Sequence, residues 1–250
     1  MSVIRPETSR LFVVLPLLLL VGACTSDSIV FNYPEEELDF KLRNLRTPSV
    51  FIDSVTDMRP VEQREGQGHF WSIQFPKDSS WERPVTEIYA EALAQDVEQT
   101  NLMQLVPLRG QADLVMSADI LSLGCRFDRG FGTLLLPAAI GAGLGMALGD
   151  DGSDRAKLGI GLGIVAILAI PMPSKDVAEV EVRLTLKARD GDILWQKTCL
   201  GEVEEKVFAT ATARQDQDYV NDHLTKAVKR ANACLLGQMR QYLIEVGQPE

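Results

Sequence analysis

Histidine is scarce in this chain, and basic residues are fewer than acidic ones. The 250-residue sequence has only 2 histidines, and its 25 basic residues stand against 35 acidic ones, for a net charge of −10. Proteins that bind nucleic acid need clustered lysine and arginine against the phosphates, so the charge excludes nucleic acid as a partner. The same charge argues against docking on anionic lipid by electrostatic attraction alone.

Motifs for catalysis, metal binding and nucleotide binding are also missing. His69 is expected in a loop and His223 in a helix with no second ligand four residues on, so both are expected at the surface or in caps. The loose glycine pattern at 159–163 is followed by no Gly-Lys-Ser/Thr sequence, which excludes a phosphate-binding loop. Asp53 and Asp57 are expected to cap a strand end or face water. We therefore expect no enzyme activity, no cofactor and no metal ion.

The N-terminus has the layout of a signal peptide. Arg5 and Arg10 form a basic region, and residues 11–21 form an apolar core too short for a membrane span of about 20 residues. The sequence Leu-Val-Gly-Ala-Cys at 20–24 resembles the bacterial lipobox. The resemblance implies cleavage before Cys24, diacylglycerol on its sulfur and acylation of the new N-terminus, and several acyl chains together anchor a protein stably. The alternative is an ordinary signal peptide followed by an incidental cysteine.

The residue after Cys24 indicates the compartment. In the bacterial sorting rule an aspartate there retains a lipoprotein at the inner membrane, so Thr25 suggests the periplasmic face of the outer membrane. Residues 1–23 are the predicted signal peptide. Residues 24–46 are polar, with glutamates at 35–37, and are predicted to form a lipidated tether.

Strand-like and helical patterns alternate along the rest of the chain. The clearest signal is at 178–188, where aliphatic residues alternate with charged and polar ones, as in a strand with one buried face. Asp190-Gly191 then marks a hairpin turn. Strands are predicted at 48–55, 112–127, 178–188 and 193–203, with a short one possible at 69–75, and helices at 84–102 and 219–243.

This order predicts an α+β fold. Two helices are expected to pack on one face of an antiparallel or mixed sheet, as a two-layer sandwich formed by residues 47–129 and 175–245. The order, the lipobox and the motif from Asp190-Gly191 to Trp195 resemble small periplasmic lipoprotein domains. Examples are the auxiliary lipoproteins of envelope transport systems and the lipoproteins that assemble curli. The resemblance is one of layout, and Cys24 is the only functional residue that it carries over.

A glycine-rich apolar insertion, residues 130–174, interrupts the predicted domain. Two uncharged stretches, 130–149 and 158–174, flank a charged turn, which predicts a helical hairpin. Helices of these lengths would span about 30 and 25 Å, close to the hydrocarbon thickness of a bilayer. Membrane contact is the favoured interpretation, and burial in a protein interface or in the domain core are the alternatives. The hairpin resembles the glycine zippers of envelope proteins, in which small residues at four-residue spacing let helices pack closely, here Gly141, Gly145, Gly149, Gly159 and Gly163.

Three further cysteines, Cys125, Cys199 and Cys234, cannot all pair within one chain. The envelope is oxidising, so a disulfide is allowed. Cys125 and Cys199 are expected on strands of one sheet, which makes them the leading pair. The alternative is three buried thiols that pack as small hydrophobic side chains.

Together these features predict an outer-membrane lipoprotein with a non-catalytic structural or assembly role. Acyl chains and residues 130–174 are expected to contact the membrane, and the domain is expected to form a homo-oligomer or to dock an envelope protein. The alternative function is that of a subunit in an oligomeric transport or secretion channel, in which the hairpins of several copies pack into a ring.

Overall fold

Three long strands form the centre of the molecule in the computed structural model. They are β5 (Leu114–Arg129), β6 (Met172–Ala188) and β7 (Ile193–Ala209), joined in antiparallel register in that order. The structure describes residues 28–36, 38, 47–66, 68–69, 72–129, 172–209 and 216–246. Cys24 and the five predicted packing glycines of the insertion lie outside these residues.

Shorter strands complete a mixed sheet on the other side of β5. The first half of β5 pairs in parallel with β1 (Ser49–Asp57), which also pairs in parallel with β4 (Gln104–Leu105). The second half pairs instead with the antiparallel β3 (Ser72–Phe75), and β2 (Gly68–His69) pairs with β3. The described residues thus form a seven-stranded mixed sheet.

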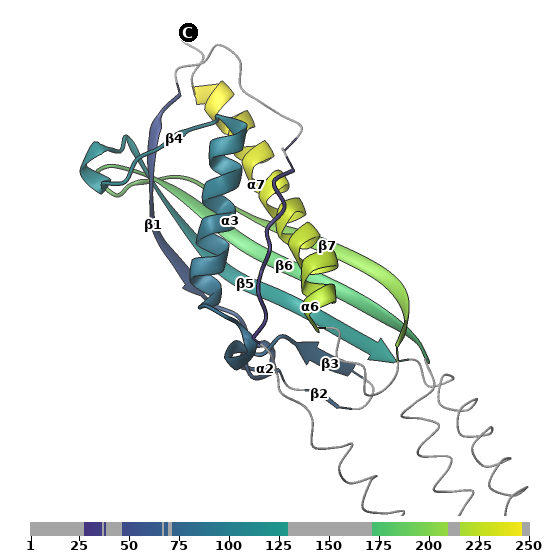
Figure 1. The fold of residues 1–250 in the computed structure, drawn as a ribbon. Helices are drawn as coiled ribbons and strands as arrows, with labels where there is room; N and C mark the ends of the chain where they lie inside the picture. Colours follow the sequence, from purple (N-terminus) through teal and green to yellow (C-terminus); the bar gives the residue numbers. More distant parts are fainter. Residues whose placement is uncertain are drawn as a thin grey trace, which may run out of the picture.

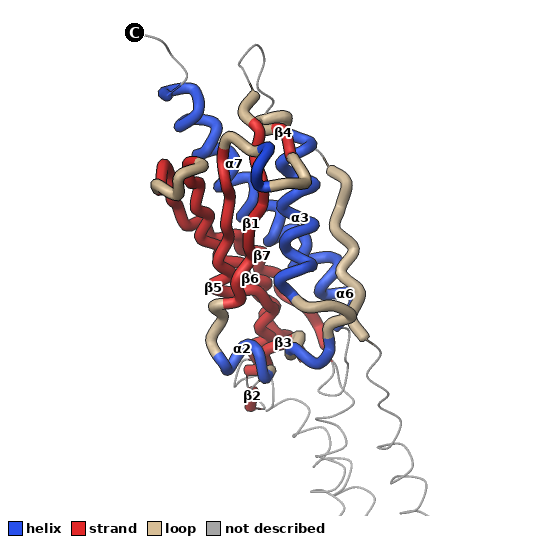
Figure 2. The backbone as a smooth tube through the Cα atoms, turned by 90° about the vertical axis from the view of Figure 1, so that its left-hand side faces the viewer, coloured by secondary structure: helices blue, strands red, loops and turns tan. Residues whose placement is uncertain are grey.

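Two long helical segments cover one face of this sheet, as Figures 1 and 2 show. One is α3 (Val85–Thr100), which Asn101 ends in the left-handed conformation, φ 53°. The other runs from α6 (Asp216–Tyr219) through the π-helical turn η3 (Val220–Leu224) into α7 (Thr225–Val246). The predicted α+β sandwich of two helices on one sheet face is confirmed.

The alternation in β6 decides which face the helices cover. Its apolar members are fully buried beneath the helices, whereas the intervening charged residues lie on the opposite face of the sheet and are partly exposed. The buried set is Val180, Val182, Leu184 and Leu186. Burying such side chains stabilises the fold by about 1.5–3 kcal/mol each, so the alternation fixes both the register and the covered face.

Helix α7 approaches β7 most closely at Gly201. A Cβ atom placed on Gly201 would lie 2.0 Å from the backbone oxygen of Ala227 and 2.7 Å from the backbone nitrogen of Ala231. No real side chain fits that space, so the glycine is required by contact between the two backbones. Beside it, a disulfide joins Cys199 of β7 to Cys234 of α7, with the Cα atoms 6.1 Å apart.

The predicted pairing of Cys125 with Cys199 is therefore wrong. Cys125 is buried on β5 opposite Ala178, whereas Cys199 lies on β7 opposite Val182, with the whole of β6 between them. Two strand spacings amount to about 9–10 Å, before the offset in register is added. A disulfide needs Cα atoms within roughly 7 Å, which only the helix above Cys199 supplies.

Two other expectations need correction. The segment between β1 and α3, in which no helix was predicted, contains the short helix α2 (Val61–Glu65) and, further on, the 3-10 turn η1 (Asp78–Ser80). Part of the predicted tether is also packed on the domain, because Ile29 and Leu38 are buried in the core. Residues 28–36, which we call the N-terminal segment, run beside α3 and α7 (Figure 1). The surface that the segment covers, which we call the groove, is lined by Gln95 and Gln99 of α3 and by Lys229 and Asn232 of α7.

Replacing Gly201 with alanine tests the close approach of α7 to β7. Because the new methyl group would overlap a helix backbone that cannot move independently, we expect a loss of about 3 kcal/mol or more in the free energy of unfolding, the upper end for overpacking. Urea denaturation measures it. Gly110→Ala is the matched control, since a Cβ there meets nothing within 4 Å. Equal midpoints for the two variants would contradict the predicted contact.

Candidate functional site

The two segments predicted to reach the membrane leave the domain at one end. Arg129 ends β5 opposite Ser174, near the start of β6, so both ends of the insertion lie side by side there. The N-terminal segment starts at the same end, where Ile29 bridges to Trp81 and donates its N–H to Ser80 at 2.7 Å. Both views show this arrangement (Figures 1 and 2). We call this the basal end of the domain.

An aromatic cluster packs the basal end. Tyr219 of α6 lies with its ring centroid 6.0 Å from Phe75 of β3 and 6.0 Å from Phe127 of β5. Its ring also lies 5.7 Å from that of His223. The cluster thereby ties the start of the last helical segment to β3 and to β5, the strand that leads to the insertion.

A buried aspartate and a histidine lie beside this cluster. Asp176 of β6 is fully buried and stands directly opposite Glu205 of β7. Two carboxylates in opposite positions on neighbouring strands repel each other. His223 lies between them, with Nε2 2.5 Å from Glu205 Oε2 and Nδ1 3.6 Å from Asp176 Oδ2. The π-helical turn η3 carries this histidine into position.

Burial makes the Asp176 carboxyl hard to ionise. It raises the pKa of Asp176 to about 6, an effect that His223 opposes and that the facing Glu205 increases. The hydrogen bond with His223 holds the pKa of Glu205 below its ordinary value. The arrangement can therefore keep a proton between two strands and a helix at the base of the insertion. In the described part of the chain no three His, Cys, Asp or Glu side chains are placed to hold a metal ion.

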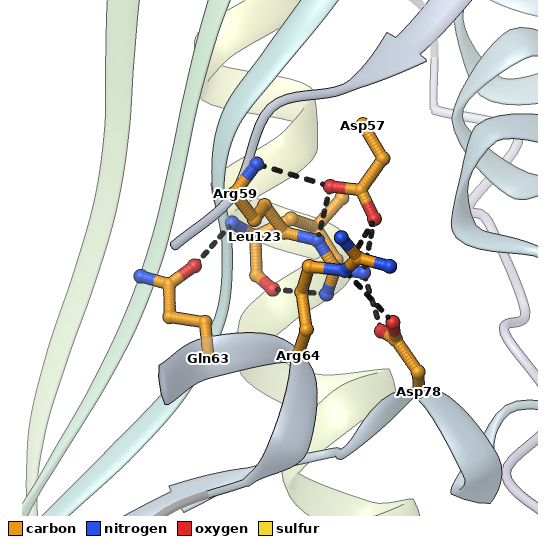
Figure 3. Close-up of polar contacts among 6 residues, drawn as sticks. All are labelled: Asp57, Arg59, Gln63, Arg64, Asp78 and Leu123. Atoms are coloured by element: carbon orange, nitrogen blue, oxygen red, sulfur yellow. Dashed lines mark hydrogen bonds and ion pairs between the residues drawn. The ribbon is translucent and has the colours of Figure 1, made fainter. Parts of the chain in front are cut away.

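A second polar cluster braces the basal end around the buried Arg59 (Figure 3). Its guanidinium lies between two carboxylates, with Nη2 2.8 Å from Asp57 and 2.6 Å from Asp78, and donates to the Leu123 carbonyl at 3.3 Å. Arg64 of α2 reaches Asp78 at 3.1 Å. Burial works against ionisation of Asp57, but the bonds from Arg59 hold its pKa below the ordinary value. The cluster fixes α2 and η1 to the strands.

The structure changes the assignment of several predicted residues. His223, expected at the surface or in a cap, is buried and paired with carboxylates. Asp57, expected to cap a strand end or face water, instead binds Arg59, whereas Asp53 lies at the surface beside Arg109. His69 forms part of β2.

Asp176 was missed although the sequence contained a signal for it. The alternation of β6, followed back from Val180 through Ala178, places Asp176 on the same buried face. Asp96 likewise lies at helical spacing from the buried Ala92 and Leu93. When the strand or helix periodicity places a charged residue on the buried apolar face, that residue is expected to have a polar partner or to lose part of its charge. Within the described ranges, no helix is both long and apolar enough to cross a membrane.

Comparisons with known proteins give weak likenesses only. No family model matches the sequence, and no curated protein matches it. Among solved structures, the chain is similar to protein XCC0632 from Xanthomonas campestris, of family DUF330, at 9% identity and a TM-score of 0.47, covering 89% of this chain and 100% of that one. It is also similar to the lipoprotein GNA1162 from Neisseria meningitidis, at 8% identity and a TM-score of 0.33, covering 78% and 99%. The function is therefore argued from the residues themselves.

Replacing Asp176 with asparagine tests the buried carboxyl. Because its pKa is higher in the folded than in the unfolded chain, the wild type should lose up to roughly 3 kcal/mol of stability as the pH rises from about 4 through 6. The Asp176→Asn chain should lack this decrease and be the more stable one at pH 7. Urea titrations across this range measure it. Asp192→Asn, at an exposed position in the β6–β7 turn, should keep the wild-type profile, and a decrease that survives Asp176→Asn would refute the assignment.

Proposed function

We propose that the chain is a lipoprotein of the bacterial envelope, anchored through Cys24, whose domain is held with its basal end toward the membrane. Its role is structural rather than catalytic: it presents the sheet and the far end of the domain to an envelope partner or to another copy. Thr25 supports the outer membrane as the location. One observation supports the proposal above all, the exit of both predicted membrane-contacting segments at the basal end.

Chain length limits how far the lipid can lie from the domain. Ser28 is four residues after Cys24, and an extended chain covers at most about 3.6 Å per residue. The Cα of Cys24 therefore lies within about 14 Å of the first described residue at the basal end. Acyl chains in a bilayer must then bring the basal end close to the surface.

The insertion adds a second attachment at the same end. Both of its limbs start from the paired ends of β5 and β6, so contact of residues 130–174 with the membrane would fix the direction of these strands. A lipid alone leaves the domain free to rotate, whereas two attachments orient it. The outer face of the sheet offers no basic patch for anionic lipid. Its charged residues are of both signs and partly paired, as in Lys175 with Glu204 and Arg183 with Asp119.

Energy transfer to the membrane tests the orientation. A fluorophore is attached to Ser79→Cys in η1 at the basal end or to Asp190→Cys in the β6–β7 turn, both exposed, and the lipidated chain is placed in vesicles with acceptor lipid. Strand β6 has 17 residues, roughly 55 Å of length, so transfer should be much stronger from position 79. Equal transfer, or stronger transfer from position 190, would overturn the orientation.

Fractionation tests the two attachments separately. With residues 1–23 replaced by a cleavable secretory signal, Cys24→Ser should reduce but not abolish membrane retention. Cys24→Ser combined with deletion of 133–171 should release the domain, while the deletion alone should leave it bound through lipid. If the doubly altered chain stays in the membrane fraction, neither attachment accounts for retention. A large discrete oligomer of the intact chain by mass photometry would favour the channel alternative.

A further inference from the structure

The N-terminal segment is held mainly by side chains that bind its backbone. Gln217 accepts the Val30 N–H at 2.9 Å and donates to the Val30 carbonyl at 2.6 Å, so one amide satisfies both groups of that residue. Gln95 of α3 donates to the carbonyl of Pro34, and Gln99 to that of Glu35, each at 3.3 Å. Hydrogen bonds to the backbone depend little on which side chains the bound segment carries.

One side chain of the segment enters a buried polar pocket. The Tyr33 hydroxyl donates to Asp96, which is fully buried, and lies 3.3 Å from the amide nitrogen of Asn232. Lys229 pairs with Asp96 at 2.6 Å and lies 4.8 Å from the centre of the Tyr33 ring. Burial and the nearby Asp96 raise the pKa of Tyr33 well above its ordinary range, so the hydroxyl stays a donor.

The polar pocket is complete apart from the tyrosine. Asn232 donates to Asp96 at 2.8 Å and accepts from the buried Tyr89 at 2.7 Å. Asp96 thus keeps a cation and an amide donor from α7 whether or not Tyr33 is present. A polar pocket that keeps its own partners without the tyrosine, beside side chains that bind an extended backbone, has the properties of a peptide-binding site, in which backbone bonds give affinity and a pocket gives specificity.

We propose that the groove between α3 and α7 is a binding site for an extended peptide that presents a tyrosine, and that residues 28–36 are its releasable ligand within the same chain. The segment forms one isolated bridge to the rest of the described structure, Ile29 to Trp81. Phe31 adds aromatic contacts with Tyr33 and Trp81, at 6.0 and 6.3 Å between ring centroids. The same segment of a neighbouring copy presents the same groups.

Release of the segment would change the reach of the domain. With the segment bound, at most about 14 Å separate Cys24 from the basal end. With the segment free, the next described point held in the core is Leu38, 14 residues after Cys24, which allows roughly 50 Å when extended. This consequence rests on the lipid at Cys24 proposed above, whereas the peptide site itself does not.

Binding of a separate peptide tests the site. A fluorescent peptide with the sequence of residues 28–36, SIVFNYPEE, is titrated into the full chain by anisotropy. The Phe31→Ala/Tyr33→Ala chain, whose own segment has lost both aromatic anchors, should bind it at least tenfold more tightly than the wild type. A peptide with alanine in place of the tyrosine should bind neither chain. Both chains are also prepared with Cys24→Ser, so that a failure of lipidation leaves this result unchanged.

A second substitution identifies the groove. Gln217→Ala in the doubly substituted chain should weaken peptide binding about tenfold, because the two bonds to Val30 are lost. Gln241→Ala, on α7 beside Glu245, is the matched control and should change nothing. Equal peptide affinity for the wild type and the double variant, or no effect of Gln217→Ala, would overturn the site. So would failure of the double variant to fold, because the segment would then be an integral part of the core.

Hydrogen exchange on the milder Tyr33→Phe chain tests separately whether the N-terminal segment can detach without unfolding of the domain. If the segment opens as its own unit, exchange at the Val30 amide should accelerate several-fold, while the amides of β5, β6 and β7 keep wild-type rates. Uniform acceleration across the sheet would show that the segment and the domain unfold together, and the releasable-ligand proposal would be wrong.

Discussion

The contact between α7 and β7 at Gly201 determines the position of most other features. Because the glycine lacks a side chain, the helix backbone lies directly on the strand, and the Cys199–Cys234 disulfide holds it there. This placement brings Lys229 and Asn232 to face Asp96 across the groove between α7 and α3. About two turns earlier along the same helical segment, it brings His223 above β6 and β7. A helix displaced by even one side-chain layer would leave Asp96 buried without its cation.

Two buried carboxylates then give the two ends of this helix different properties. Asp96 has a lysine at 2.6 Å and an amide at 2.8 Å, and a buried charge satisfied in this way strongly resists removal of a partner. Asp176 has a more distant ion-pair partner, His223 at 3.6 Å, and faces another carboxylate. Its raised pKa is the result of that incomplete compensation. The groove is therefore the firmly fixed part of the helical layer, whereas the basal end responds to protonation.

The sequence predicts what depends on local pattern. The alternation in β6, the Asp190-Gly191 turn and the two amphipathic helices predicted the sandwich, because each buries a stripe that a short window reveals. The disulfide partner of Cys199 depends on which helix packs over β7 and on the order of the strands in the sheet. A short stretch of sequence reveals neither. Residues 28–36 were predicted as part of the tether because their own sequence does not show what holds them. Their backbone is bound by Gln217, Gln95 and Gln99, which are distant in sequence. Cys24 and the insertion remain sequence-based predictions.

The proposed attachment and the proposed peptide site act on the same stretch of chain. Residues 28–36 lie between Cys24, the proposed lipid site, and β1, so a load transmitted from that lipid to the domain would pass through the bonds of Gln217 and through Tyr33 in its pocket. The insertion is attached to β5 and β6 and bypasses this segment altogether. Release of the segment would thus lengthen one attachment without loosening the other, and the domain would stay oriented while residues 28–36 became available to a neighbouring copy. The freed residues 28–36 of one molecule would fit the vacated groove of a neighbour on the same membrane, because both carry the same sequence. The proposed anchoring would in this way also promote assembly of several copies.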